Sequence, residues 1–312
     1  MATRAQARRS AEQSSRVTVA AAHDRMIPDG MTRRWLDLPA APRVHMVEAG
    51  TGPVVLHLHG STTCCLSHLP LLERLDRVHS VVPDRPGFGL SDPVPVARSE
   101  FRAAAVRFVD QVLDALEAPS ASLVGCSMGG TWATWFAMAR PERVDRLVLL
   151  GAPPGLPGTR PPWPLRIMTT PVIGDLLTRY VPPRRQDVLR LMTVMGEGST
   201  LPRHPDLLDS LVAAGRDRAV AAANLAELRA VLGWIGFRRQ TSISPDELRG
   251  TDVPTLAVWG DHDPVGSPAV AEQVADLVPD ARLELLPAGH VPWLGHPDRV
   301  SALVGDFVLA AS

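Results

Sequence analysis

The stretch ASLVGCSMGG, residues 121–130, decides the fold of this chain. An apolar run ends at Gly125, and Ser127 stands between that glycine and Gly129, where a strand is expected to give way to a helix. A serine hydroxyl is a weak nucleophile, so a site that uses one must hold it in a tight, strained turn. Side chains at positions 125 and 129 would collide in such a turn. The pattern predicts a nucleophilic serine, although a glycine-rich turn with an incidental serine would look the same.

The composition excludes several kinds of chemistry. The chain has 312 residues, of which 45% are hydrophobic, and a net charge of −1, so no nucleic-acid partner is expected. All 32 basic residues are arginine, which removes Schiff-base, P-loop and Ser–Lys chemistry because each needs an amine. The cysteines Cys64, Cys65 and Cys126 include an adjacent pair and no CxxC spacing. We therefore expect a reducing compartment, with no disulfide framework, no metal and no cofactor.

The N-terminal segment, residues 1–30, is expected to be an exposed basic arm. It contains Arg8-Arg9, but the polar segment SAEQSSR follows where an export signal needs an apolar run. No run in the chain reaches the roughly 18 apolar residues that a membrane span requires. We therefore expect a cytoplasmic protein whose partner is a small-molecule substrate, and the sequence leaves its oligomeric state open.

Short apolar runs alternate with longer amphipathic ones on both sides of residues 121–130. An amphipathic helix is predicted over 99–117, where apolar residues recur at helical spacing. Strands are predicted over 43–50, 53–60, 79–83 and 121–126, and in the segments VDRLVLLG, TLAVWG and RLELL. Such alternation is typical of an α/β fold with a mostly parallel central sheet and helices on both faces.

The alternation stops between residues 151 and 245. This segment has proline clusters, mostly helical patterns, and 12 arginines against 7 acidic residues, whereas residues 246–312 have 3 arginines against 11 acidic residues. The shift predicts a helical cap over 151–245, inserted between two parts of the core, 31–150 and 246–312.

Partners for Ser127 are expected at the carboxyl ends of other strands, because loops there converge on one crevice. The strand after the insertion ends in VWGDHDP, which offers Asp261 and Asp263. The last strand ends in LLPAGH, and His290 is the one histidine of ten that follows Ala-Gly at such an end. His59 is expected to stabilise its own turn. The order Ser, Asp, His is that of an α/β-hydrolase.

The chain resembles the capped α/β-hydrolases of the esterase, lactonase and C–C hydrolase kind. The resemblance rests on LHLHG at 56–60, DRPGFGLSD at 84–92, GCSMGG at 125–130, WGDHDP at 259–264 and PAGH at 287–290. It implies that Ser127 is the nucleophile, that His290 is the general base and that Asp263 orients it. Asp261, the alternative acid, is better suited to bonding nearby backbone in the turn.

The oxyanion hole is expected to use the backbone N–H groups of Met128 and Ser61, with Gly60 allowing a close approach. Cys126 is expected to pack in the core without reacting. A serine nucleophile argues against the haloalkane dehalogenases and epoxide hydrolases, which use aspartate. We expect hydrolysis of an ester or lactone through an acyl-enzyme. Three alternatives remain open: a C–C hydrolase, a perhydrolase, and a non-hydrolytic biosynthetic or ligand-binding protein. The segment HGSTTCCLS has fewer glycines than the oxyanion loop of a C–C hydrolase usually has.

The substrate is expected to be small and largely apolar, because the insertion offers many apolar side chains to a pocket above Ser127. Trp163 and Trp234 are the largest of them. The full set of candidates is Trp163, Leu165, Met168, Val172, Ile173, Leu176, Leu177, Met192, Met195, Leu232, Trp234 and Phe237.

Overall fold

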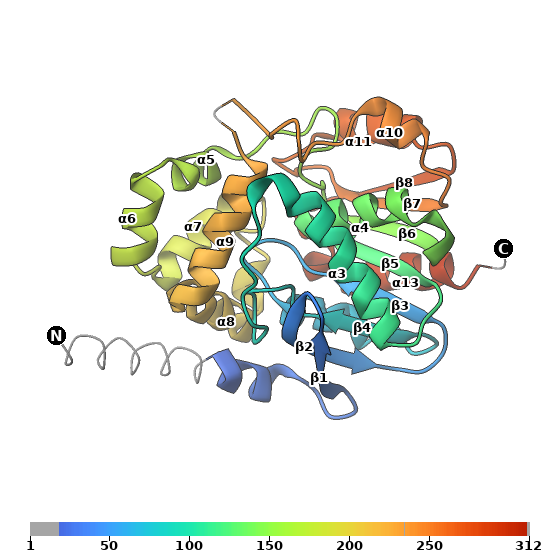
Figure 1. Ribbon diagram of the computed structural model, residues 1–312, viewed down its shortest axis with the longest axis horizontal. Helices are drawn as coiled ribbons and strands as arrows, with labels where there is room; N and C mark the ends of the chain where they lie inside the picture. Colours follow the sequence, from blue (N-terminus) through green and yellow to red (C-terminus); the bar gives the residue numbers. More distant parts are fainter. Residues whose placement is uncertain (1–18, 234, 311–312) are drawn as a thin grey trace.

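A single sheet runs through the computed structural model, which describes residues 19–233 and 235–310 (Figure 1). Its strand order is β1-β2-β4-β3-β5-β6-β7-β8. The strands β3 to β8 pair in parallel, whereas β2 pairs antiparallel with both β1 and β4. The strands are β1 (Thr32–Leu38), β2 (Ala41–Ala49), β3 (Val54–Leu58), β4 (His79–Pro83), β5 (Ala121–Cys126), β6 (Val144–Leu150), β7 (Thr255–Gly260) and β8 (Ala281–Leu286).

The sheet is covered by helices on both faces, as expected. Successive side chains of a strand point to opposite faces, so Leu123 and Val124 of β5 pack into two different hydrophobic clusters. The first cluster lies under α3 (Phe101–Ala115), α4 (Met128–Ala139) and α11 (Pro268–Leu277). The second lies under α2 (Leu69–Leu72), α12 (Pro292–Gly295) and α13 (Pro297–Val308). The expected α/β class and the mostly parallel sheet are confirmed.

The turn from β5 into α4 accepts only glycine at two positions. A Cβ atom on Gly129 would lie 1.9 Å from the carbonyl oxygen of Leu58, at the end of β3. A Cβ atom on Gly125 would lie 2.5 Å from the Cα atom of Gly130. Both clashes are with backbone, which cannot move aside cheaply, so the two glycines allow α4 to pack directly against the end of β3.

Among the described residues, five α-helices lie within the range 151–245 that was predicted for the cap. Figure 1 shows them gathered beside the sheet. Short α10 (Pro245–Arg249) then leads back to β7. The five helices are α5 (Trp163–Thr169), α6 (Ile173–Tyr180), α7 (Arg185–Val194), α8 (Pro205–Arg216) and α9 (Arg218–Val231).

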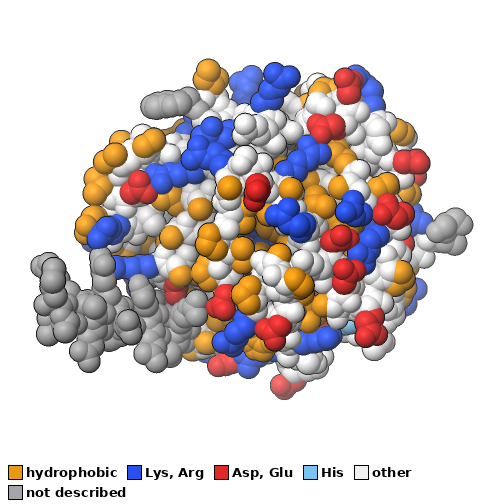
Figure 2. Space-filling view, in the orientation of Figure 1, with side chains coloured by type: hydrophobic (Ala, Val, Ile, Leu, Met, Phe, Trp, Pro, Cys, Tyr) orange, Lys and Arg blue, Asp and Glu red, His pale blue; other side chains and the backbone are white. Residues whose placement is uncertain are grey.

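Apolar side chains of α6 and of the residues just before it are exposed, and Figure 2 shows hydrophobic side chains gathered at this edge. Trp163, at the start of α5, is 64% exposed, and Leu176 is 51% exposed. Amphipathic spacing marks an apolar face but does not say what that face contacts. Six of the candidates do not line the cavity above Ser127: Trp163, Met168, Val172, Ile173, Leu176 and Leu177. Trp234 lies outside the described residues. Within the described ranges, no helix is long and apolar enough to span a bilayer.

One face of the described part of the N-terminal segment is buried, although the sequence predicted an exposed arm. Residues 19–26 are helical, and Val19, Ala22 and His23 are buried. These three residues follow helical spacing, so they share the face that packs on the core. The arm prediction is wrong for this part, and residues 1–18 lie outside the described residues. Strand β1, which the sequence analysis did not predict, follows; its mostly polar, exposed residues carry little strand signal.

We expect Gly129→Ala to destabilise the protein strongly. The added methyl group meets the backbone of Leu58 and His59, and such overpacking costs about 1–3 kcal/mol or more. The matched control is Gly250→Ala, where the nearest atoms would be 3.6 Å away. Urea unfolding should show a large loss for Gly129→Ala and little change for Gly250→Ala. Equal stabilities of the two variants would contradict the tight packing of this turn.

Candidate active site

Ser127 stands at the carboxyl end of β5 in a strained backbone conformation. Its φ of 50° and ψ of −119° are unusual for a residue other than glycine. The conformation is held by two backbone hydrogen bonds: the Ser127 N–H donates to Leu150 O at 3.2 Å, and Thr131 N–H donates to Ser127 O at 3.1 Å. The strain at Ser127 is thus maintained by β6 on one side and by the first turn of α4 on the other.

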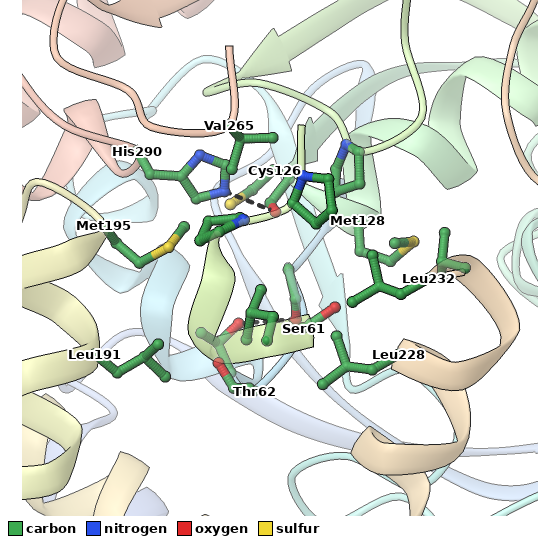
Figure 3. Close-up of a pocket in the computed structure, with 18 of the residues that line it drawn as sticks. Ser61, Thr62, Cys126, Met128, Leu191, Met195, Leu228, Leu232, Val265 and His290 are labelled. Atoms are coloured by element: carbon green, nitrogen blue, oxygen red, sulfur yellow. Dashed lines mark hydrogen bonds between the residues drawn. The ribbon is translucent and has the colours of Figure 1, made fainter. Parts of the chain in front are cut away.

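The structure brings His290 and Asp263 to this serine. His290 Nε2 lies 2.8 Å from Ser127 Oγ (Figure 3). On the other side of the ring, Nδ1 lies 2.8 Å from Asp263 Oδ2 and donates to this carboxylate. Asp263 is buried, and it also accepts backbone N–H groups from Ala152 and Val265, each at 2.8 Å. The carboxylate therefore has a fixed pose from which it orients the imidazole.

The environment of His290 favours its protonated form. Burial by itself lowers the pKa of His290, but the charge of Asp263 and its hydrogen bond oppose that effect, and the pKa is raised above its ordinary value of 6.5. A positive charge that forms on the imidazole would thus be stabilised. The serine, the imidazole and the carboxylate form a continuous path along which the serine proton can move to His290.

The second acid of the same strand end does not reach the imidazole. Asp261 is exposed, accepts the backbone N–H of Ala288 at 3.2 Å, and contacts the neighbouring His262. These are the turn contacts expected of it. His296 is also apart from the site, because its Nε2 bonds Pro287 O at the surface.

The loop after β3 lies directly beside Ser127. A Cβ atom on Gly60 would be 3.2 Å from the Cβ of Ser127, and both Ser61 and Met128 line the same cavity (Figure 3). Helix α9 holds this loop from the opposite side: Ser61 Oγ donates to Glu227 at 3.3 Å, and Thr62 N–H donates to Asn224 at 3.2 Å. Residues from outside the core strands therefore fix the loop.

A buried ion pair also supports the loop after β3. Arg85 donates to Glu227 at 2.8 Å, and both side chains are almost completely buried. The backbone N–H of Arg85 donates to His59 Nε2 at 2.9 Å, and His59 Nδ1 donates to Gly60 O at 2.8 Å. Burial lowers the pKa of His59 to about 3, so the ring is neutral in this path. The expected structural role of His59 agrees with these contacts, whereas Glu227 had no sequence signal.

The loop that carries His290 is also held by residues between α7 and α8. His290 N–H donates to Met195 O at 2.9 Å, and Val291 N–H donates to Glu197 at 2.8 Å. Glu197 is 1% exposed, and burial raises the pKa of its carboxyl group. A lone glutamate in the segment GEGST gave no indication of this role in the sequence. Both loops that flank Ser127 thus depend on contacts from the segment between β6 and β7.

A mostly apolar cavity opens above Ser127 (Figure 3). Its volume is about 90 Å³ as swept by the centre of a water molecule. Cys126 reaches its edge, and burial raises the pKa of this thiol, as expected for an unreactive cysteine. The predicted residues that line the cavity are Leu165, Met192, Met195, Leu232 and Phe237, and the unpredicted ones include Leu191, Leu228, Val231 and Val265.

The chain is similar to known proteins in sequence and in structure. A hydrolase of 2-hydroxy-6-oxononadienedioate and 2-hydroxy-6-oxononatrienedioate from Cupriavidus pinatubonensis is 30% identical over 85% of this chain and 90% of its own length. A pimeloyl-[acyl-carrier protein] methyl ester esterase from a Shewanella species is 28% identical over 83% of this chain and 91% of its own. Carboxylesterase CesB from Bacillus subtilis superimposes with a TM-score of 0.70 at 22% identity, covering 96% of this chain and 100% of its own.

The model of the alpha/beta hydrolase family matches residues 54–303, which include every strand from β3 to β8. Together with the fold and with the 30% identical relative, this match is sufficient: the chain belongs to the alpha/beta hydrolase family.

Proposed function

We propose that the protein is a serine hydrolase that cleaves an ester or lactone of a small, uncharged and largely apolar substrate. The observation that carries the proposal is the unbroken hydrogen-bonded series from Ser127 Oγ through His290 to Asp263, at the base of an apolar cavity. Membership of a family whose relatives include esterases supports it.

The geometry is suited to acyl transfer in two steps. Ser127 Oγ attacks the carbonyl carbon while its proton moves to His290 Nε2, and the same proton then leaves with the alcohol as the acyl-enzyme forms. A water molecule next gives its proton to His290 and attacks the acyl carbon, which releases the acid and restores Ser127. The backbone N–H groups of Ser61 and Met128 would stabilise the negative oxygen in both steps.

The preference for an uncharged substrate follows from the cavity wall. Among the described residues that line it, there is no arginine, and the chain contains no lysine. A buried carboxylate without a cationic partner would be strongly unfavourable. The acyl or alkyl group should therefore be apolar, and the cavity volume suits a chain of moderate length.

A second candidate is hydrolysis of an oxo-dienoate compound, because one relative that is 30% identical carries such a name. Its substrate is named as a dioate, which has two carboxylates, and the apolar wall provides no cation for either. An assay with 2-hydroxy-6-oxo-6-phenylhexa-2,4-dienoate, the compound in another relative's name, separates the two candidates. Faster turnover of this compound than of any simple ester would favour the second.

We expect a fluorophosphonate probe to label Ser127 and no other residue. Ser127→Ala should abolish labelling and lower esterase kcat by several orders of magnitude, because only positioning and the oxyanion hole would remain. Circular dichroism should show an unchanged fold. If the variant kept more than about a tenth of the wild-type rate, the assignment of Ser127 as nucleophile would be wrong.

The pH dependence should distinguish the two acids. Only neutral His290 can accept the Ser127 proton, and its pKa is raised above 6.5. Wild-type kcat/KM should thus rise with pH through a midpoint above 6.5. Asp263→Asn removes the charge that raises this pKa, so the midpoint should move down while kcat falls by about 10⁴-fold. Asp261→Asn is the matched control and should leave both close to wild type. Equal losses in the two variants would overturn the choice of Asp263.

A series of esters from acetate to octanoate tests the apolar cavity. Burial of each CH₂ is worth about 0.8 kcal/mol, so kcat/KM should rise roughly fourfold per methylene until the cavity is full. Leu191→Ala enlarges the cavity and should move the optimum to longer chains. Leu176→Ala makes the same change on exposed α6 and should leave the optimum unaltered. A wild-type profile that falls steadily beyond acetate would contradict the apolar substrate.

A further inference from the structure

A cluster of side chains that could bind a metal ion lies in the core, apart from the cavity above Ser127. It consists of His23, Cys64, Cys65 and Asp84, and one potential ligand atom of each lies within 4.8 Å of the others. All four side chains are buried. They come from the helix over residues 19–26, from the loop after β3 and from the residue that follows β4. None of them takes part in the proposed acyl transfer.

The orientation of His23 points to a ligand. Its Nδ1 lies 2.9 Å from Val19 O, and because a carbonyl oxygen only accepts, Nδ1 must carry the proton. Nε2 faces the cluster and lies 3.6 Å from Asp84 Oδ2. Burial alone would lower the pKa of His23, but the nearby Asp84 carboxylate and Cys64 raise it to about 11, so without a cation Nε2 carries a proton, whose place a metal ion would take. Within the described residues, this completely buried atom has no hydrogen-bond partner. Histidines that bind metals are commonly held in this way, with the other ring nitrogen donating to a backbone carbonyl.

Asp84 is held in a fixed pose by its own partners. His45 Nδ1 donates to Asp84 Oδ2 at 2.8 Å, and Cys65 N–H donates to Asp84 Oδ1 at 2.8 Å. These bonds keep the carboxylate charged and immobile next to the two thiols. The Asp84 carboxylate and the sulfur atoms of Cys64 and Cys65 are metal-binding donors gathered in a dry interior, where a cation would balance the charge of the carboxylate and of the deprotonated thiols.

We propose that His23, Cys64, Cys65 and Asp84 bind one zinc ion. Two thiolates, an imidazole and a carboxylate match the donor types and the number of ligands of a closed structural zinc site, and thiolates disfavour magnesium and calcium. With bonds of about 2.0–2.3 Å, tetrahedral ligands lie about 3.3–3.8 Å apart, so the widest pair has to close by roughly 1 Å. Binding releases the two thiol protons and the Nε2 proton of His23 to solvent.

The position of the site suggests a structural role. The ion would tie the helix over residues 19–26 to the loops that follow β3 and β4. The first of these loops also carries Gly60 and Ser61, which lie beside Ser127. The absence of CxxC in the sequence led us to expect no metal, because an adjacent cysteine pair with distant histidine and aspartate partners does not form a recognisable spacing.

The test is the metal content of the full chain, produced in zinc-supplemented medium and purified without chelator. Inductively coupled plasma mass spectrometry should find about one zinc ion per chain. The double variant Cys64→Ser/Cys65→Ser should lose it, whereas Cys126→Ser, which alters the third buried cysteine, should keep it. A chelator should lower the Tm of the wild type and of Cys126→Ser but not that of the double variant.

Cobalt provides a readout that does not depend on the folding of any variant. The wild-type chain loaded with Co²⁺ should show an intense thiolate-to-cobalt charge-transfer band in the near ultraviolet. A wild-type chain that holds less than about a tenth of an equivalent of zinc after incubation with zinc chloride, or that lacks this band with cobalt, would overturn the proposal. Retention of zinc by the double variant would overturn it as well.

Discussion

The close approach of α4 to the end of β3 is the contact on which the rest of the site depends. At Gly129 the helix backbone comes so near to Leu58 that no side chain fits between them. This contact brings the loop after β3 against Ser127 and requires the sharp turn in which Ser127 adopts a positive φ. Ser127 and the proposed oxyanion donors are therefore brought together by this packing contact between α4 and β3.

The segment between β6 and β7 does more than cover the cavity. Glu227 and Asn224 of α9 hold the loop with Ser61 and Thr62, and Glu197 holds the loop with His290. The Arg85–Glu227 pair is almost completely buried, and removal of one partner from such a pair typically costs about 3–5 kcal/mol. Because these contacts between α9 and the loop after β3 are largely buried, a change in the position of α9 would alter the geometry around Ser127.

The helix over residues 19–26 supports the loop after β3 from the side opposite to α9. His23 contacts Asp84, which in turn accepts the backbone N–H of Cys65. The segment from Gly60 to Cys65 is therefore held at its first residues by α9 and at its last by the cluster around Asp84. A loop fixed at both ends keeps its backbone N–H groups in place without reorganisation, which is what electrostatic stabilisation of a transition state needs.

Much of the fold and of the candidate site could be predicted from local patterns. The elbow around Ser127, the strand ends with Asp263 and His290, and the alternation of strands and helices are each encoded in a few adjacent residues, because a tight turn or a repeat of apolar residues restricts the local sequence directly. The roles of Glu197 and Glu227, the exposure of Trp163 and the burial of His23 carry no such local mark. They arise only when segments far apart in the chain pack together, since the free energy of a buried charge or an apolar face depends on its partner rather than on its neighbours in sequence. The sequence alone therefore determined the fold and the three residues around the proposed reaction, and tertiary packing decided what surrounds and supports them.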